Sequence, residues 1–150
     1  MAEGPTLRDT LARMDAAWSA FHERATSMPT ERLADRIGEG GWTRKQMLAH
    51  IAAWHDLTVE RLGRFGESGE PAELSEHEDV INARAARAAE GRTTGEVVLA
   101  MADSYRRLRR DVSTLSDEQL GAHDGWAAGI IAGNSYEHYA EHLADLNERG

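Results

Sequence analysis

The chain has 150 residues and none of them is cysteine. This absence excludes disulfide bonds, a thiolate nucleophile and a thiolate metal ligand. Thiol chemistry would therefore need a thiol brought by a second substrate. Lysine occurs once, as Lys45, against sixteen arginines. Because Lys45 falls in the first turn of a predicted helix, where water would surround it, Schiff-base catalysis is not expected.

Long hydrophobic runs are also absent. No apolar run approaches the ~18 residues that a membrane helix needs, and the first residues, MAEGPTLRDT, lack a basic stretch followed by an apolar one. We therefore expect no signal peptide, no membrane span and a cytoplasmic location. The hydrophobic fraction of 41% and the charged fraction of 29% are ordinary for a globular protein. Residues 1–150 are predicted to form a single domain.

Acidic residues outnumber basic ones, 26 to 17, and the formal net charge is −9. Proteins that bind nucleic acid neutralise phosphates with cations, so this balance argues against a nucleic-acid partner. The one basic cluster is RRLRR at 106–110. Its apolar member, Leu108, falls on the apolar face of a predicted helix, which predicts that the arginines form a solvated face.

Apolar residues recur at intervals of three and four in three stretches, the spacing of one face of an α-helix. They predict helices over about residues 6–27, 44–65 and 93–115. The faces comprise Leu7, Leu11, Met14, Trp18, Phe21 and Ala25; Met47, Ile51, Trp54, Leu62 and Phe65; and Val98, Met101, Tyr105, Leu108, Val112 and Leu115. The first helix is separated from the second by Pro29 and by glycines 38, 40 and 41. A short helical turn is predicted within that connection, at 30–36.

Helix starts are marked by capping residues. Thr6 is a predicted N-cap, and four Ser/Thr-x-x-Glu/Gln patterns predict capping boxes. These boxes pair Thr43 with Gln46, Ser75 with Glu78, Thr93 with Glu96, and Ser116 with Gln119. The second box would open an alanine-rich helix that ends near residue 90, and the fourth a short turn.

A loop is predicted at GAHDGW, and the last helix is expected to begin after it, between Ala127 and Asn134, and to reach about Asn147. No segment alternates between apolar and polar residues, so no strand is predicted. The expected fold is therefore an all-α four-helix bundle with short extra helical turns in its connections.

Two histidines stand one helical turn apart in the segment NSYEHYAEHLADL, at His138 and His142. Side chains at i and i+4 lie above one another and can bind one metal ion together. Asn134, Glu141 and Asp145 flank the pair and could orient an imidazole through its second nitrogen.

A metal site would need a third ligand from another helix. His50 and His55, both in the second predicted helix, are candidates, and periodicity does not choose between them. Without a metal, the pair would be ordinary hydrogen-bonded polar residues at the edge of the core. The other histidines, His22, His77 and His123, are predicted to be surface or loop residues, with His123 the nearest to the site.

The stretches GGWTRKQMLAHIAAWHD and NSYEHYAEHLADL together resemble the DinB/YfiT-like superfamily of four-helix bundles. The middle of the chain, VINARAARAAEGRTTGEVVLAMADSYRRLRRDVSTLSDEQL, is most similar to the ClbS/DfsB branch. The resemblance covers roughly residues 40–146 and depends on the order and spacing of several short motifs. It implies the same all-α fold and, because members of the superfamily commonly form homodimers, a homodimer.

The resemblance places the superfamily's metal triad on His50, His138 and His142, and so favours His50 over His55. The implied metal is zinc or nickel. Trp54 and Tyr139 are expected to line a pocket, with His55 also near it. Three protein ligands leave open coordination positions, which is typical of a reactive site.

Three functions remain open. The first is a metal-dependent enzyme acting on a small reactive electrophile, such as a transferase or isomerase that uses a low-molecular-weight thiol of the mycothiol type. The second is a ClbS/DfsB-like self-protection protein that hydrolyses or sequesters a reactive natural product without a metal. The third is a non-catalytic ligand-binding bundle. Against the first, only scattered arginines such as Arg44, Arg61 and Arg84 could meet an anionic thiol.

Overall fold

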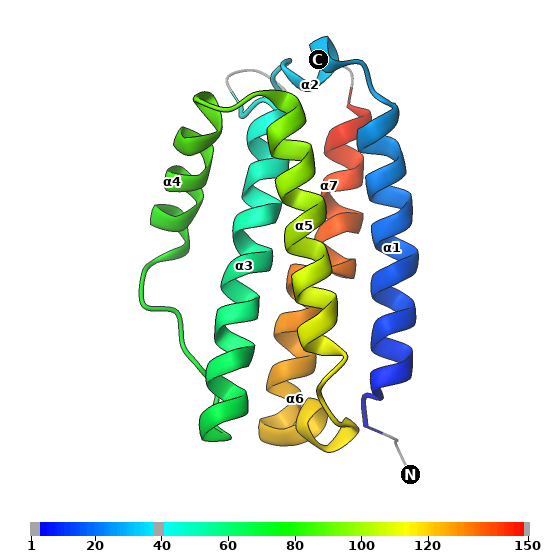
Figure 1. The fold of residues 1–150 in the computed structure, drawn as a ribbon, viewed down its shortest axis with the longest axis vertical. Coiled ribbons are helices and arrows are strands. Elements are labelled where there is room, and N and C mark those ends of the chain that lie inside the picture. The colour runs from blue at the N-terminus through cyan, green and yellow to red at the C-terminus, as the bar shows by residue number, and fades with distance from the viewer. Residues whose placement is uncertain (1–3, 38–40, 149–150) are drawn as a thin grey trace.

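Four helical columns stand side by side in the computed structural model, which describes residues 4–37 and 41–148 (Figure 1). Three columns are α1 (Leu7–Ser27), α3 (Arg44–Ser68) and α5 (Thr94–Val112), and the fourth consists of α6 (Asp117–Asn134) and α7 (Tyr136–Asn147) end to end. The short helix α2 (Thr30–Leu33) lies at one end of the bundle, and α4 (Glu78–Glu90) packs outside it against α3. No strand occurs in the described residues. The all-α bundle with short helices in its connections is confirmed.

The apolar faces predicted from the sequence meet in one hydrophobic core. On α1, Met14, Phe21 and Ala25 are fully buried, whereas Leu7, Leu11 and Trp18 at the edges of the same face are partly buried. The predicted face of α5 packs against both α1 and α3. Burial of such a side chain stabilises the fold by roughly 1.5–3 kcal/mol, so this shared core orients the columns that carry the site.

The predicted caps form with one exception. Thr6 accepts a hydrogen bond from the backbone of Asp9, and reciprocal capping boxes start α3, α5 and α6. The box predicted at Ser75 and Glu78 is wrong. Because α4 begins at Glu78, this glutamate is the first helical residue and not the third, and His77 caps the helix by accepting from Asp79 N–H.

The last column has two non-helical breaks, one in the predicted loop before the last helix and one within the predicted helix itself. Backbone angles leave the helical region at 122–125, where His123, Asp124 and Gly125 have φ of 54°, 56° and 77°. A regular helix follows from Trp126. The second break is at Ser135, with φ −132° and ψ −103°. The fully buried Ser135 hydroxyl donates to the Ile131 carbonyl, a local bond that competes with helix continuation.

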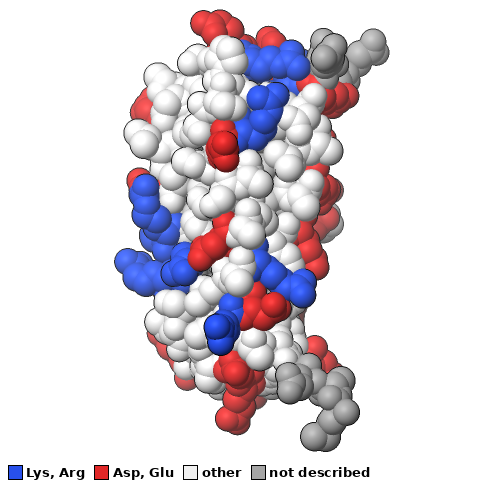
Figure 2. Space-filling view, turned by 90° about the vertical axis from the view of Figure 1, so that its right-hand side faces the viewer, with Lys and Arg blue, Asp and Glu red and all other residues white. Residues whose placement is uncertain are grey.

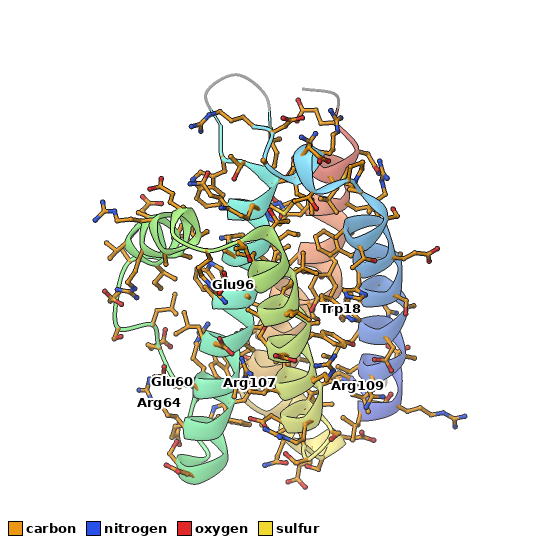
Figure 3. The ribbon with its side chains drawn as sticks, turned by 45° about the horizontal axis from the view of Figure 1, so that its top comes forward. Trp18, Glu60, Arg64, Glu96, Arg107 and Arg109 are labelled. Atoms are coloured by element: carbon orange, nitrogen blue, oxygen red, sulfur yellow. The ribbon has the colours of Figure 1, made fainter. Side chains whose placement is uncertain are left out.

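The surface carries interspersed charges of both signs, as Figure 2 shows for the face formed by α1. In the basic cluster at 106–110, Leu108 is fully buried, as predicted. Arg107 and Arg109 lie on α5 (Figure 3) and pair with Asp56 and Asp15 at 2.7 and 2.8 Å. None of the described helices has the length and apolar content that crossing a bilayer requires. Residues 1–3 of the predicted domain and residues 38–40 of the predicted glycine break lie outside the described residues.

Candidate metal centre

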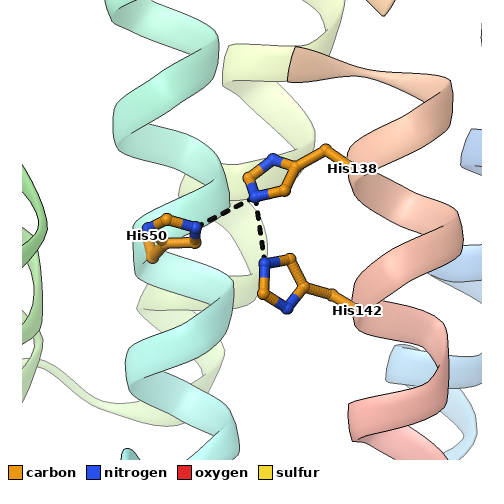
Figure 4. A group of neighbouring side chains, drawn as sticks. All are labelled: His50, His138 and His142. Atoms are coloured by element: carbon orange, nitrogen blue, oxygen red, sulfur yellow. Dashed lines mark hydrogen bonds between the residues drawn. The ribbon is translucent and has the colours of Figure 1, made fainter. Parts of the chain in front are cut away.

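Three imidazole rings converge between α3 and α7 (Figure 4). His138 and His142 come from adjacent turns of α7, and His50 faces them from α3. The Nε2 atom of His138 lies 2.9 Å from Nε2 of His50 and 3.0 Å from Nε2 of His142. One nitrogen from each ring falls within 4.8 Å of the other two. The ring on α3 that joins the pair is therefore His50.

The tautomer of His50 is set by Asn82, a residue of α4. One oxygen of Asn82 accepts from Trp54 Nε1 at 2.7 Å and lies 2.9 Å from Nδ1 of His50. Because an indole nitrogen only donates, the Asn82 atom must be the acceptor. His50 therefore carries its proton on Nδ1, and its Nε2 lone pair points at the other rings.

Asp145 sets the tautomer of His142 in the same way. Its carboxylate lies 2.7 Å from Nδ1 of His142, three residues earlier on α7. The carboxylate accepts a hydrogen bond from Nδ1–H, so Nε2 of a neutral His142 also presents a lone pair. Two of the three rings are thus held in the form that a metal ligand needs, each by an acceptor on its second nitrogen.

His138 completes the triad, but it cannot donate a hydrogen bond to the Nε2 atoms of both His50 and His142. A proton on its Nε2 would serve one of the two facing lone pairs, and a proton on Nδ1 would leave three lone pairs pointing at one another. Its Nδ1 is buried and has no partner among the described residues. A cation between the three Nε2 atoms would satisfy all of them at once. With Zn–N bonds of about 2.0–2.1 Å, tetrahedral ligands lie about 3.3 Å apart, close to the spacing here.

Burial keeps His50 and His138 neutral. Desolvation and then the nearby His142 lower the pKa of His50 to about 4 and that of His138 to about 3. At neutral pH both rings therefore hold a free lone pair without first having to lose a proton. This is the protonation state that metal binding requires.

His55 belongs to a different network, in the core behind the triad. Its Nδ1 donates to Ser104 Oγ at 2.8 Å, since the Ser104 hydroxyl donates in turn to the Met101 carbonyl. Its Nε2 accepts from the hydroxyl of Tyr139 at 2.5 Å. Both ring nitrogens are satisfied and His55 is fully buried. The structure thus places His55 and Tyr139 in the core and not on the pocket wall where we expected them.

A pocket of about 670 Å³ opens beside the triad, between α3, α4, α6 and α7. Its lining comprises Trp42, His50, Trp54, Arg61, Leu74, Glu78, Asn82, Gly129, Ile130, Gly133, Asn134, His138, Glu141 and His142. Of the residues predicted to orient an imidazole, only Asp145 forms such a bond. Asn134 donates instead to the Ile130 carbonyl at 2.9 Å, and Glu141 is exposed at the pocket edge.

Asn82 is the functional residue that the sequence did not single out. It lies on an alanine-rich helix outside the bundle, so no apolar periodicity predicted which way its side chain faces. The Asn-Ala pair within the family-like stretch was its only signal. The remaining histidines lie away from the triad: His22 stacks on Trp18, His77 caps α4, and His123 hydrogen bonds to the Gly69 carbonyl at 2.8 Å.

Comparison with known proteins agrees with this architecture. The sequence model of the DinB superfamily matches residues 13–145. A search of curated proteins finds no match. Among solved structures, the "Sibling Lethal Factor Precursor - DfsB" is 16% identical, with a TM-score of 0.81 over 96% of this chain and 94% of that one.

Two further structures have the same fold. The colibactin self-resistance protein ClbS, solved in complex with double-stranded DNA, is 12% identical, with a TM-score of 0.80 over 97% of this chain and 96% of that one. An uncharacterised protein from Escherichia coli UTI89 is 15% identical, with a TM-score of 0.78 over 94% and 90%. At such identities the likeness shows a common fold. By its sequence match over residues 13–145, the chain belongs to the DinB superfamily.

Proposed function

We propose that this protein is a metal-dependent enzyme whose His50, His138 and His142 hold one zinc or nickel ion. The observation that carries the proposal is the convergence of three Nε2 atoms, two of them fixed as lone pairs by Asn82 and Asp145. The donor set fits the ion, because neutral imidazole is a ligand that suits both zinc and nickel.

The residues around the triad have two different roles in binding. Asn82 and Asp145 hold two rings in place, while Trp42 and Trp54 offer apolar surface to a substrate in the pocket. Three protein ligands leave coordination positions open on the pocket side. When bound, such an ion lowers the pKa of a coordinated water or thiol and so supplies a nucleophile near neutral pH.

The proposed substrate is a small reactive electrophile. Because the chain has no cysteine, a thiol reaction requires an external thiol of the mycothiol type, and the activity would be that of a thiol transferase or isomerase. We also expect a homodimer in the cytoplasm. Sedimentation equilibrium tests the dimer independently of activity.

Elemental analysis of protein purified without added metal tests the proposal. We expect about one zinc or nickel per chain, and none in His138→Ala, because two remaining imidazoles bind weakly. His123→Ala, which removes a histidine far from the triad, is the control and should keep its metal. Metal-free wild-type protein that cannot be loaded with either ion would contradict the proposal. A His50→Ala variant that binds as tightly as wild type would show that the third ligand is wrong.

A second function is favoured by the shared fold with DfsB and ClbS. ClbS is described as a self-resistance protein, and a pocket of this size could hydrolyse or sequester a reactive natural product without a metal. Protection of sensitive cells by the triple variant His50→Ala, His138→Ala, His142→Ala would support this function against the first. A protein that neither binds metal nor protects would be a non-catalytic binding bundle.

ClbS was solved with double-stranded DNA, so DNA binding needs its own test. The net charge of −9 and the pairing of Arg107 and Arg109 with carboxylates lead us to expect none. Fluorescence anisotropy with a labelled duplex at low salt measures this. Saturable binding that weakens steeply with salt would contradict the expectation.

A further inference from the structure

Arg61 lies in the same pocket as the triad but far along it. It follows His50 by eleven residues on α3, which corresponds to about 16 Å along the helix axis. Its side chain lines the pocket and the residue is only 9% exposed. The pocket therefore has a cationic group some distance from its imidazole group.

The hydrogen bonds of Arg61 leave most of its donors unused. Nε donates to the Ala72 carbonyl at 2.9 Å, and the guanidinium lies 5.5 Å from the ring centre of Trp126. No hydrogen bond from either terminal nitrogen reaches a described residue, and neither nitrogen is sealed off by protein atoms. The two terminal NH₂ groups are thus unpaired among the described residues and accessible to a ligand.

Arg61 also lacks a carboxylate partner. Several other arginines have one: Arg84 pairs with Glu76, and Arg109 with Asp15, at 2.7 and 2.8 Å. For Arg61, Glu73 provides only an attraction at longer range, and burial lowers the pKa of its guanidinium. Arginine is rarely buried unless it is paired, and Arg61 has no carboxylate partner among the described residues.

The alternative explanation, that the arginine simply satisfies backbone carbonyls, describes Arg44 better. Arg44 is fully buried, and its guanidinium donates to the carbonyls of Leu146 and Glu148 at the end of α7. It has two carbonyl partners and does not line the pocket. Arg61 has one carbonyl partner and is a lining residue of the pocket.

We propose that Arg61 binds a carboxylate of the substrate, so that the enzyme acts on a monoanionic carboxylic acid whose reactive group reaches the histidine triad. Because Nε is occupied, the two terminal nitrogens form a fork that fits the two oxygens of a carboxylate. Glu78 and Glu141 also line the pocket and disfavour a dianion such as a phosphate monoester. Trp54 and Leu74 provide an apolar wall for an aryl or alkyl body between the two ends.

This inference rests on the proposed function for its reactive end but can be tested without metal. The probes are benzoate, 3-phenylpropionate and 5-phenylpentanoate, each compared with its neutral primary amide. Binding is followed by tryptophan fluorescence on full-length protein, both as purified and after chelator treatment, since a bound metal could itself attract a carboxylate. We expect the best acid to bind at least about tenfold more tightly than its amide, in both preparations.

Two variants assign this preference to Arg61. Arg61→Met should bring the affinities for acid and amide within about twofold. Arg61→Gln keeps an N–H that can reach Ala72 and guards against loss of the local fold, which circular dichroism checks. The matched control is Arg64→Met, one turn further along α3, where Arg64 is exposed beside Glu60 (Figure 3). This variant should keep the wild-type preference.

The outcomes separate the two proposals. Equal affinity for acid and amide in wild type, no saturable binding of any of the three acids, or a full preference in folded Arg61→Gln would each overturn the role of Arg61. If wild-type protein cannot be loaded with zinc or nickel but still prefers the acids to their amides, the role of Arg61 is supported and the metal-dependent function is contradicted. If the protein binds metal but does not prefer the acids to their amides, the metal site is supported and the role of Arg61 is contradicted.

Discussion

At the scale of single residues, one oxygen of Asn82 holds both His50 and Trp54. It accepts from the imidazole at 2.9 Å and from the indole at 2.7 Å. The same atom thus fixes the tautomer of a proposed metal ligand and the position of a pocket wall. Asp145 performs the first of these roles for His142. Acceptors on the second nitrogen of a ligating histidine contribute strongly to metal affinity.

Removal of either acceptor should weaken metal binding. We expect Asn82→Ala and Asp145→Ala to lower the affinity for zinc about 10- to 100-fold, because the imidazole loses its orientation and part of its basicity. Competition against a chromophoric chelator measures the affinity. The control is Glu141→Ala, which removes a pocket carboxylate that contacts no imidazole and should change the affinity by less than about threefold. Equal losses in all three variants would show a general effect of charge or folding.

The buried hydroxyl of Tyr139 should stabilise the fold through His55. Tyr139→Phe leaves Nε2 of His55 without its only donor in the core, and an unsatisfied buried group costs about 1–3 kcal/mol. Urea unfolding at pH 7.5 measures the loss. Tyr136→Phe, on the same helix, removes a hydroxyl with no hydrogen bond among the described residues and should be nearly neutral. If the two variants lose the same free energy of unfolding, the hydrogen bond between Tyr139 and His55 does not stabilise the fold.

At the scale of elements, the start of each helix depends on where its cap lies. Thr93 forms a reciprocal box with Glu96 and starts α5. Ser75 has the same sequence pattern with Glu78, yet α4 starts two residues too late for the box to form. The pattern alone was therefore insufficient, because the irregular segment before α4 is held by tertiary contacts such as that of Arg61 with Ala72.

These two serine/threonine positions should respond differently to the same change. Thr93→Ala should lower the free energy of unfolding by about 1 kcal/mol, since a capping side chain is lost. Ser75→Ala should have an effect within about 0.5 kcal/mol, as is usual for exposed positions without a specific contact. Urea denaturation of both variants in parallel measures the difference. A loss at Ser75 as large as that at Thr93 would mean that the predicted box forms in solution.

The helices of the bundle were predictable because each carries a long apolar face. The predicted faces of α1, α3 and α5 supply much of the core. The loop GAHDGW was predicted, but its three successive positive φ values were not, because they depend on how the loop packs and not on any apolar spacing. The contact of Asn82 with His50 was not predicted either. It joins α4 to α3, and no apolar spacing in the sequence indicates how these two helices pack. The histidine pair on α7 needed only the 3.6-residue period.

At the scale of the whole molecule, the protein buries three neutral histidines. His55 is fully buried, His50 nearly so, and His138 partly. Burial lowers the pKa of His55 and His138 to about 3 and that of His50 to about 4, from an ordinary value of 6.5. In the unfolded chain all three would take up protons as the pH falls through 6.5, while the folded protein would not.

Metal-free protein should therefore lose stability on acidification. Between pH 6.5 and about 4 the unfolded state binds more protons, so the free energy of unfolding falls as the pH falls. Each histidine contributes at most about 1.4 kcal/mol per pH unit within that window. Urea unfolding at pH 7.5, 6.5 and 5.5 in chelator measures the slope, and His50→Gln should show a shallower one. A wild-type stability that is constant from pH 7.5 to 5.5 would contradict the burial of neutral rings.

The position of α4 outside the bundle has a consequence for how molecules enter. This helix packs mainly on α3, yet it supplies Glu78 and Asn82 to the pocket. Because Asn82 both lines the pocket and holds the ring of His50, any displacement of α4 would change the shape of the pocket and the orientation of that imidazole together.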